Sequence, residues 1–388
     1  MIRYGMVGGG PGAFIGEVHR MAAELDGACE LVAGAFSSDP GRSAERGREL
    51  GLDASRVYGS FAEMAAAEAD LPAERRIQFV SIVTPNHLHF EPACVFLEAG
   101  FDVVCDKPLT TSIDDAYELC RLVGDRDAVF AVTHNYTGYP MVKEARSQIG
   151  SGRIGTVRKI LVEYLQGWLS TALESTGQKQ ADWRTDPARA GVAGALGDIG
   201  SHAHNLVQYV TGLEVESICG DLTTFVEGRK LEDDASLLLR FTGGARGTLS
   251  ASQVCVGEEN GLSLRVYGTD GALSWRQEEP ETLVFTPVDG PSEVLRRGHS
   301  YLSPAAAGAS RLPPGHPEGF IEGFANVYRA VAGAIGARLE GRAPSAADMD
   351  YPTVFDGARG VHFLHRAVEA GRTDGWVAAR YDGPTSTT

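Results

Sequence analysis

The stretch GGGPGAFIGEVHR, residues 8–20, decides the fold of this chain. It follows an apolar run at 2–7, and Phe14, Val18 and Ala22 then recur at helical spacing. A strand, a glycine-rich loop and a helix in this order can bind a dinucleotide pyrophosphate. The glycines free backbone amides, and the helix N-terminus attracts negative charge. We therefore interpret the beginning of the chain as a nucleotide-binding strand–loop–helix.

The glycines of this loop depart from the common G-x-G-x-x-G pattern. Gly8 and Gly10 supply the first two positions, but position 13 is Ala13. Gly16 takes the third role, at which helix and strand pack closely, with three residues inserted before it. Glycine clusters also form ordinary turns, but the place of this one between a strand and a helix favours a nucleotide site. We predict cofactor contacts from Gly8, Gly10, Phe14 and Ile15.

Length and composition limit the classes of protein to which the chain can belong. Its 388 residues exceed one ordinary core and predict two domains. The net charge of -16 argues against a nucleic acid or an anionic membrane as partner, because their phosphates would repel the chain. No apolar run approaches the ~20 residues of a membrane span, and we find no signal peptide. The 6 cysteines lack paired spacing, so we expect a reducing, cytoplasmic location without disulfides or zinc.

Strands and helices alternate over the first third of the chain. Helix-like stretches such as 112–123 separate apolar runs that predict strands at 2–7, 30–36, 77–83, 102–105 and 128–133. Continuous apolar runs are typical of strands buried on both faces. We therefore predict an α/β domain with a parallel, doubly wound sheet.

The pattern changes after about residue 135, where strands follow one another. We predict strands at 156–166, 215–226, 234–242, 245–254, 261–267, 271–276 and 281–287. We predict helices at 141–150, 198–211, 318–340 and 354–371, and a loop at 289–318. This pattern indicates a second α/β domain with a large, mostly antiparallel open sheet. The expected domains are 1–135 and 136–380, followed by a flexible tail at 381–388.

The second predicted strand ends in Ser37-Ser38-Asp39, and Arg42 follows closely. Enzymes selective for NAD usually have an acidic residue at this tip, whereas hydroxyls and a guanidinium suit the 2′-phosphate of NADP. We predict that Ser37, Ser38 and Arg42 bind the cofactor and favour NADP over NAD. Two alternatives stay open: these residues cap the next helix, or Asp39 reaches a ribose hydroxyl.

Two more motifs follow later strands of the predicted parallel sheet. Thr84-Pro85-Asn86 with His87 and His89 comes after 77–83, and Asp106-Lys107-Pro108 comes after 102–105. Ligands bind at the carboxyl ends of strands in such sheets. The alternative for Lys107 is a solvated loop lysine, and for His87 and His89 it is loop capping or metal binding. A His-x-His pair without a third ligand is a poor zinc site, so we predict no metal. The predicted cofactor contacts are Thr84, Pro85, Asn86, His89, Asp106, Lys107 and Asn135.

The segment 197–202, Gly-Asp-Ile-Gly-Ser-His, places Asp198 and His202 one helical turn apart. A carboxylate beside an imidazole is an arrangement that orients a general base. The alternative interpretation is a helix N-cap at Asp198 and a packed core histidine at 202.

In combination, these motifs resemble the Gfo/Idh/MocA oxidoreductase family, which includes glucose–fructose oxidoreductase and inositol dehydrogenases. The matching elements are the glycine loop ending in Gly16-x-x-His19, Thr84-Pro85-Asn86 with His89, Lys107-Pro108, and Asp198-x-x-x-His202. They run in the family's order over nearly the whole chain, and the resemblance implies that the first domain is a Rossmann domain. The chain departs from the family pattern in its longer glycine loop and in Asp106, where the family commonly has Glu.

The resemblance implies an NAD(P)-dependent dehydrogenase acting on a secondary hydroxyl of a sugar, cyclitol or glycoside. Lys107 would bond the reacting hydroxyl, His202 would exchange its proton, and Asp198 would bond a neighbouring hydroxyl or orient the site. The resemblance also implies a homodimer or homotetramer formed through the large sheet. The expected substrate contacts are Lys107, Tyr136, Tyr164, Gln166, Trp168, Trp183, Arg184, Asp198 and His202. For Tyr136, Tyr164, Gln166, Trp168, Trp183 and Arg184, ordinary packing is the alternative that stays open.

Three other functions compete with this interpretation. Some relatives hydrolyse glycosides through a transient redox step with tightly held NAD, so a hydrolase of this kind is the second candidate. The joint presence of Lys107, Asp198 and His202 argues against a nucleotide-binding regulator without chemistry. A serine hydrolase is disfavoured because the chain has no G-x-S-x-G motif.

Overall fold

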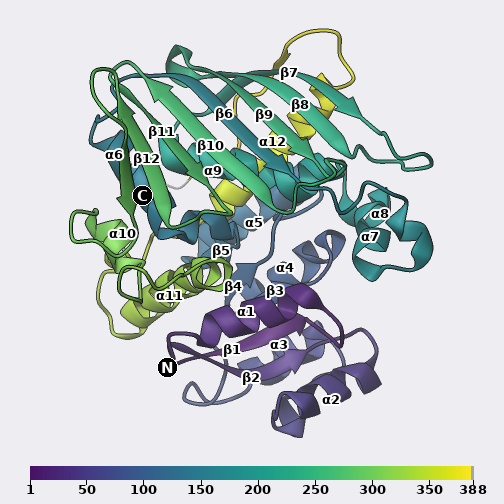
Figure 1. Ribbon diagram of the computed structural model, residues 1–388. Helices are drawn as coiled ribbons and strands as arrows, with labels where there is room; N and C mark the ends of the chain where they lie inside the picture. The colour runs from purple at the N-terminus through teal and green to yellow at the C-terminus, as the bar shows by residue number, and fades with distance from the viewer. Residues whose placement is uncertain (386–388) are drawn as a thin grey trace. The chain divides into compact units, whose positions relative to one another are not determined.

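The computed structural model describes residues 1–385 and contains two compact units (Figure 1). The first unit consists of residues 1–135 and 320–358, and the second of residues 136–319 and 359–383. The chain thus leaves the first unit after Asn135 and returns to it at Phe320. Among the described residues, no helix is long and apolar enough to cross a membrane.

The first unit contains a five-stranded sheet in the order β2-β1-β3-β4-β5, with every neighbouring pair parallel. Its strands are β1 (Ile2–Gly8), β2 (Cys29–Ala35), β3 (Phe79–Val83), β4 (Asp102–Cys105) and β5 (Phe130–Val132). The helices between them are α1 (Phe14–Glu24), α2 (Pro40–Glu49), α3 (Phe61–Ala69), α4 (Phe90–Glu98) and α5 (Ile113–Arg126). β3, β4 and β5 are buried throughout, which explains why their sequences are mostly apolar, with Ser81 and Asp102 as the polar exceptions.

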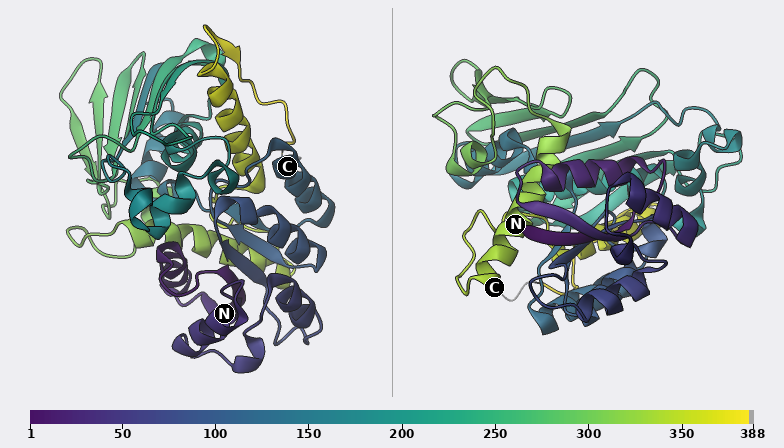
Figure 2. Two further views of the ribbon diagram at one scale, coloured as in Figure 1. Left: turned by 90° about the vertical axis from the view of Figure 1, so that its right-hand side faces the viewer. Right: turned by 90° about the horizontal axis from the view of Figure 1, so that it is seen from below.

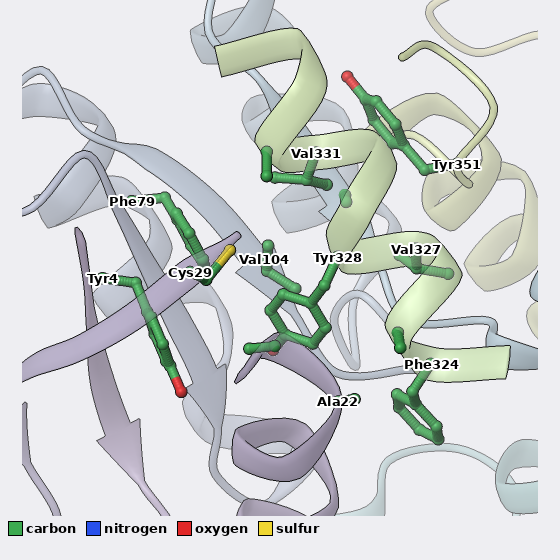
Figure 3. Close-up of a cluster of buried hydrophobic side chains, with 14 of the residues drawn as sticks. Tyr4, Ala22, Cys29, Phe79, Val104, Phe324, Val327, Tyr328, Val331 and Tyr351 are labelled. Atoms are coloured by element: carbon green, nitrogen blue, oxygen red, sulfur yellow. The ribbon is translucent and has the colours of Figure 1, made fainter. Parts of the chain in front are cut away.

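Helix α11 (Phe320–Leu339) completes the core of the first unit, although we predicted it in the second domain. Phe324, Val327 and Tyr328 lie in one buried cluster with Tyr4 and Phe79 of the sheet (Figure 3). The apolar stripe of α11 packs against α1 and the sheet. Periodicity identified this helix, but it does not identify the sheet that a helix covers.

The second unit contains a nine-stranded sheet in the order β13-β12-β11-β10-β6-β9-β8-β7-β14. All pairs are antiparallel except β6 with β9. Its strands are β6 (Val157–Leu165), β7 (Val215–Thr223), β8 (Asp234–Phe241), β9 (Arg246–Ser252), β10 (Gly261–Gly268), β11 (Gly271–Arg276), β12 (Thr282–Pro287), β13 (Glu293–Arg296) and β14 (Val377–Ala378). The predicted fold class, a Rossmann-type sheet plus a large, mostly antiparallel one, is confirmed.

Helices cover one face of this sheet, where α6 (Pro140–Gly150) and α9 (Ser201–Thr211) contact its strands. In Figure 2 the yellow helix α12 (Val354–Ala370) lies on the same side of the strands. Short helices α7 (Lys179–Arg184) and α8 (Pro187–Ala190) occupy the long connection between β6 and α9.

Two predicted irregular regions contain structure. The predicted loop 289–318 includes strand β13 and helix α10 (Pro304–Gly308). The strand was missed because it is short and flanked by Pro and Gly, whereas α10 begins at a Ser303 cap followed by proline. Part of the predicted tail 381–388 lies outside the described residues, but Tyr381 packs edge-on against His362 of α12.

Candidate functional site

The glycine loop after β1 is built from close contacts that exclude larger residues. Gly8 and Gly9 have φ angles of 89° and 72°, a conformation that favours glycine. A Cβ atom on Gly16 would lie 2.6 Å from the Cα of Gly9, so helix α1 passes directly against the loop. A Cβ on Gly10 would lie 2.8 Å from the carbonyl oxygen of Phe36 at the end of β2. Gly16 therefore takes the close-packing role that the sequence predicted.

The first turn of α1 is suited to an anion. Its N-cap residue, Ala13, makes no side-chain cap, whereas Asp39, Ser60 and Ser112 cap α2, α3 and α5. The first amides of α1 are thus left for another acceptor, and the helix dipole favours a negative charge there. Phe14, the first residue of the helix, is 65% exposed. The glycine cradle and the uncapped helix fit a dinucleotide pyrophosphate.

The tip after β2 shows the capping arrangement that was one of the open alternatives. Asp39 Oδ1 accepts a hydrogen bond from the backbone amide of Arg42 at 3.0 Å, which caps α2. Ser37 Oγ accepts one from the amide of Asp39 at 3.1 Å. Ser38 and Arg42 are exposed. Capping therefore engages Asp39 and Ser37, while Ser38 and Arg42 face solvent.

His89 connects two loops at the carboxyl edge of the parallel sheet. Its ring is fully buried, with Nδ1 2.8 Å from the carbonyl oxygen of Pro108 and Nε2 2.9 Å from that of Thr84. Burial lowers the pKa of His89, and the hydrogen bonds to the two carbonyl oxygens oppose this shift. We predicted that His89 binds the cofactor, but the structure places its ring between two backbone segments. The same edge contains Asn86, which is buried, and Pro85, which is partly exposed.

Asp106 fixes the backbone that carries Lys107. Its Oδ1 accepts hydrogen bonds from the amide of Lys107 at 2.8 Å and from Thr133 Oγ1 at 2.9 Å. The carboxylate thereby joins the ends of β4 and β5. The peptide between Lys107 and Pro108 is cis, and Lys107 is half-buried.

His19, Tyr328 and Ser81 form a buried polar network next to Asp106. His19 Nδ1 is 2.7 Å from the Tyr328 hydroxyl, which is also 2.7 Å from Ser81 Oγ. His19 Nε2 is 4.0 Å from Asp106 Oδ1. Burial lowers the pKa of His19 to about 4, so this imidazole is neutral at physiological pH.

His134 and Asn135, which follow β5, lie at the same carboxyl edge of the parallel sheet. Burial, and then the charge of Lys107, lower the pKa of His134 to about 3. Asn135 is also buried, and its Nδ2 has no hydrogen-bond partner among the described residues. A buried amide donor without a partner is uncommon and is consistent with the predicted cofactor contact.

In the second unit, Asp198 and His202 lie on one continuous helical segment. Residues Leu196–Gly200 form a π-helical turn that leads directly into α9. Asp198 Oδ2 accepts hydrogen bonds from Arg184 Nε at 3.0 Å and from Gln253 Nε2 at 2.9 Å. Asp198 is therefore part of an ion pair and does not act as an N-cap.

Two tyrosines hold the ring of His202. The imidazole lies edge-on to Tyr136 with ring centroids 4.9 Å apart, and 6.2 Å from the ring of Tyr164. The two tyrosine hydroxyls are 2.5 Å apart; Tyr164 donates to Asn260 Oδ1 at 2.6 Å, and Asn260 Nδ2 donates to Tyr136 at 3.4 Å. For both tyrosines the sequence left substrate contact or ordinary packing open; both are buried and their hydroxyls are bonded to each other, which favours packing. They support His202.

Trp168, Trp183 and Arg184 extend the same cluster. Trp168 Nε1 donates to Gln166 Oε1 at 2.9 Å, and Gln166 donates to Asn260 at 3.0 Å. The Arg184 guanidinium lies 4.2 Å from the ring centroid of Trp183 and 5.9 Å from that of Trp168. The substrate residues predicted in the second unit are thus brought into one connected cluster.

Sequence reasoning missed Gln253 and Asn260. Gln253 directly follows β9 and Asn260 directly precedes β10, so both lie at the sheet end at which β6 leads into Gln166. An amide side chain at each of these strand ends was the available signal. Among the described residues, no group of three or more His, Cys, Asp or Glu side chains is placed to hold a metal ion.

Comparison with known proteins agrees with this architecture. A family model described as an oxidoreductase family with an NAD-binding Rossmann fold matches residues 2–134, and a GFO/IDH/MocA C-terminal domain model matches residues 142–274. A solved oxidoreductase from Sinorhizobium meliloti is 48% identical and superposes with a TM-score of 0.88, covering 97% of this chain and 99% of its own.

Two further relatives are described by what they bind or oxidise. An inositol dehydrogenase homolog from Azotobacter vinelandii, solved with NAD+, is 36% identical with a TM-score of 0.91, covering 97% of both chains. The homolog was also solved with NADH and myo-inositol. Levoglucosan dehydrogenase of Pseudarthrobacter phenanthrenivorans is 28% identical over 73% of this chain and 75% of its own.

Proposed function

Because this chain belongs to the Gfo/Idh/MocA family of NAD-binding oxidoreductases, we propose that it is a sugar or cyclitol dehydrogenase. It would transfer a hydride between a secondary hydroxyl of the substrate and the nicotinamide of NAD or NADP. The observation that carries the proposal is the side-chain cluster of the second unit. There Asp198, His202, Arg184 and Trp168 combine a proton acceptor, fixed charges and aromatic faces.

The first unit would hold the dinucleotide. The proposed contacts are the glycine loop with Phe14 and Ile15, the β2 tip, and the edge formed by residues 84–86, 106–107 and 135. When bound, the nicotinamide supplies the hydride acceptor or donor. Lys107 bonds the reacting hydroxyl, and Asp106 fixes the Lys107 backbone through its amide.

The second unit would handle the substrate. His202 exchanges the proton of the reacting hydroxyl, since an imidazole changes its protonation state near neutral pH. Asp198 presents a carboxylate whose orientation is fixed by Arg184 and Gln253. Such fixed groups suit a ring with several hydroxyls, in agreement with the myo-inositol and levoglucosan named for the relatives.

The choice between NAD and NADP has support on both sides. The relatives solved with NAD+ or NADH favour NAD. The exposed Ser38 and Arg42 after β2 favour NADP, because no free carboxylate other than the helix-capping Asp39 stands there to repel a 2′-phosphate. The sequence prediction is that NADP is accepted at least as well as NAD.

A paired cofactor and substrate screen tests the proposal. Each dinucleotide should raise the melting temperature, since binding at a hundredfold excess over Kd stabilises by about 2.7 kcal/mol. NAD and NADP are then tested with myo-inositol, aldoses, levoglucosan and aryl glycosides, following nicotinamide absorbance. We expect net reduction of the cofactor with at least one polyol. Release of the aglycone from a glycoside without net cofactor turnover would instead support the redox-assisted hydrolase.

A further inference from the structure

Glu232 binds three consecutive backbone amides in front of the helix that carries Asp198 and His202. Its Oε1 accepts hydrogen bonds from the amide of Gly194 at 2.7 Å and from that of Leu196 at 3.1 Å. Its own carbonyl oxygen accepts one from the amide of Ala195 at 3.0 Å. The side chain and backbone of one residue therefore bind three amides at the start of this helical segment.

This segment needs external support. Residues Leu196–Gly200 form a π-helical turn, a rare and less favourable geometry that recurs at functional sites. Ala195, which precedes the turn, offers no side chain that caps it. A buried carboxyl group at this end replaces the missing cap.

The backbone at residue 194 lies so close to the backbone of Glu232 that only glycine fits there. A Cβ atom added to Gly194 would overlap the carbonyl oxygen of Glu232 and press on the Leu231 side chain.

Burial raises the pKa of Glu232 to about 7, and the neighbouring Asp233 adds to this shift. Asp233 binds a different segment, the amides of Phe225 and Val226, together with Arg229.

We propose that Glu232 is a positioning residue for the reaction: it acts through the backbone of 194–196 to fix where Asp198 and His202 lie. This inference rests on the roles proposed above for Asp198 and His202. Displacement of the π-helical turn by a fraction of an ångström moves both side chains together, because they occupy one continuous helix. Misplacement of reacting groups by about 1 Å can cost ~10²-fold in rate.

The test compares Glu232→Ala with Glu232→Gln, using NAD and myo-inositol as the first probes. Because Oε1 accepts both side-chain bonds, a glutamine oxygen at the same place retains them, whereas alanine removes them. We expect Glu232→Ala to lower kcat by ~10- to 100-fold with little change in the Kd for NAD. We expect Glu232→Gln to retain most of the kcat.

Glu318 supplies a matched control in the same unit. It is also buried, and its Oε1 accepts two backbone amides, those of Arg311 and Leu312, both at 2.7 Å. Glu318 also pairs with the buried Arg297, whose Nη1 donates to Oε1 at 2.7 Å, so Glu318→Ala should destabilise the protein at least as much as Glu232→Ala and still leave kcat unchanged. If Glu232→Ala does not fold, Gly194→Ala tests the same contact from the other side and should lower kcat as well.

A second readout does not depend on turnover. Histidine-labelled protein gives imidazole NMR signals, and that of His202 is identified by its loss in His202→Gln. We expect Glu232→Ala to shift the His202 signal and its titration midpoint, while Glu318→Ala leaves both in place. Wild-type kcat and an unmoved His202 signal in Glu232→Ala would overturn the inference with the proposed function intact. If no polyol is oxidised by the wild type, the proposed function fails and the NMR comparison still decides on Glu232.

Discussion

Asp198 is bonded to Arg184 and Gln253 through one carboxylate oxygen, and this bonding divides the proposed chemistry between Asp198 and His202. A carboxylate in an ion pair is a weaker base, because protonation would break its bonds to the guanidinium and the amide. His202 contacts aromatic rings on two sides. This bonding supports the proposed division, in which His202 exchanges the proton and Asp198 anchors a substrate hydroxyl.

Replacing His202 or Lys107 tests these roles. We expect His202→Ala and Lys107→Ala to lower kcat by ~10²–10⁴, the usual contribution of a general base or an equivalent group. Dinucleotide affinity, measured by thermal shift, should persist in both variants. Asp198→Ala should raise KM for the polyol more than it weakens cofactor binding.

His204 provides the control for this experiment. It lies on the same helix α9, but its ring stacks on Phe363 with centroids 4.1 Å apart. His204→Gln should keep kcat near the wild-type value. Near-wild-type oxidation by His202→Ala would remove His202 from the mechanism.

The residues that could be predicted from the sequence are those that lie in short local motifs. Lys107, Asp198 and His202 were predicted because each belongs to a recognisable spacing, and the family resemblance that these motifs suggested is confirmed. Glu232, Gln253 and Asn260 were not, because their bonding partners lie far away in the sequence. The pairing of β8 with β9, of β9 with β6 and of β6 with β10 brings them to one end of the sheet.

Among the elements, the loop between β1 and α1 shows how close backbone contact limits which residues can occupy a position. The glycine pattern suggested a phosphate cradle, and the structure adds the reason for the late third glycine. Gly16 faces Gly9 across the junction, so helix and strand stay in contact despite the inserted residues. Strand β13 and helix α10 escaped prediction because such short elements carry almost no periodic signal.

Substitution of Gly16 by alanine should damage this element. The added methyl would press on the Gly9 backbone, which cannot move without changing the loop, so we expect a loss of ~1–3 kcal/mol in stability. NAD and NADP binding should weaken or disappear in titrations of the folded variant.

Gly124 in α5 is the matched control for the helix effect of alanine. A Cβ there would meet nothing within 4 Å, so Gly124→Ala should gain stability, because alanine favours a helix by about 1 kcal/mol. Unchanged dinucleotide affinity in Gly16→Ala would show that the loop is an ordinary turn.

For the whole molecule, the uncovered face of the nine-stranded sheet is the feature that bears on assembly. Register places one row of residues side by side across eight strands, and none of them is fully buried. The row consists of Cys219, Leu238, Thr248, Leu161, Arg265, Ser274, Val284 and Val294. Five of its eight members are apolar, which is more than a solvated face needs.

We predict that the protein is a homodimer or homotetramer that buries this row. Sedimentation velocity at micromolar concentration should give a mass at least twice the 41.3 kDa of one chain. Leu238→Glu, at a position that is 50% exposed, should dissociate the assembly, because a charge buried within an apolar contact loses its hydration. Phe225→Glu serves as control, since Phe225 is 66% exposed on the connection between β7 and β8, away from the row. A wild-type mass of one chain would contradict this prediction and leave the apolar row facing water.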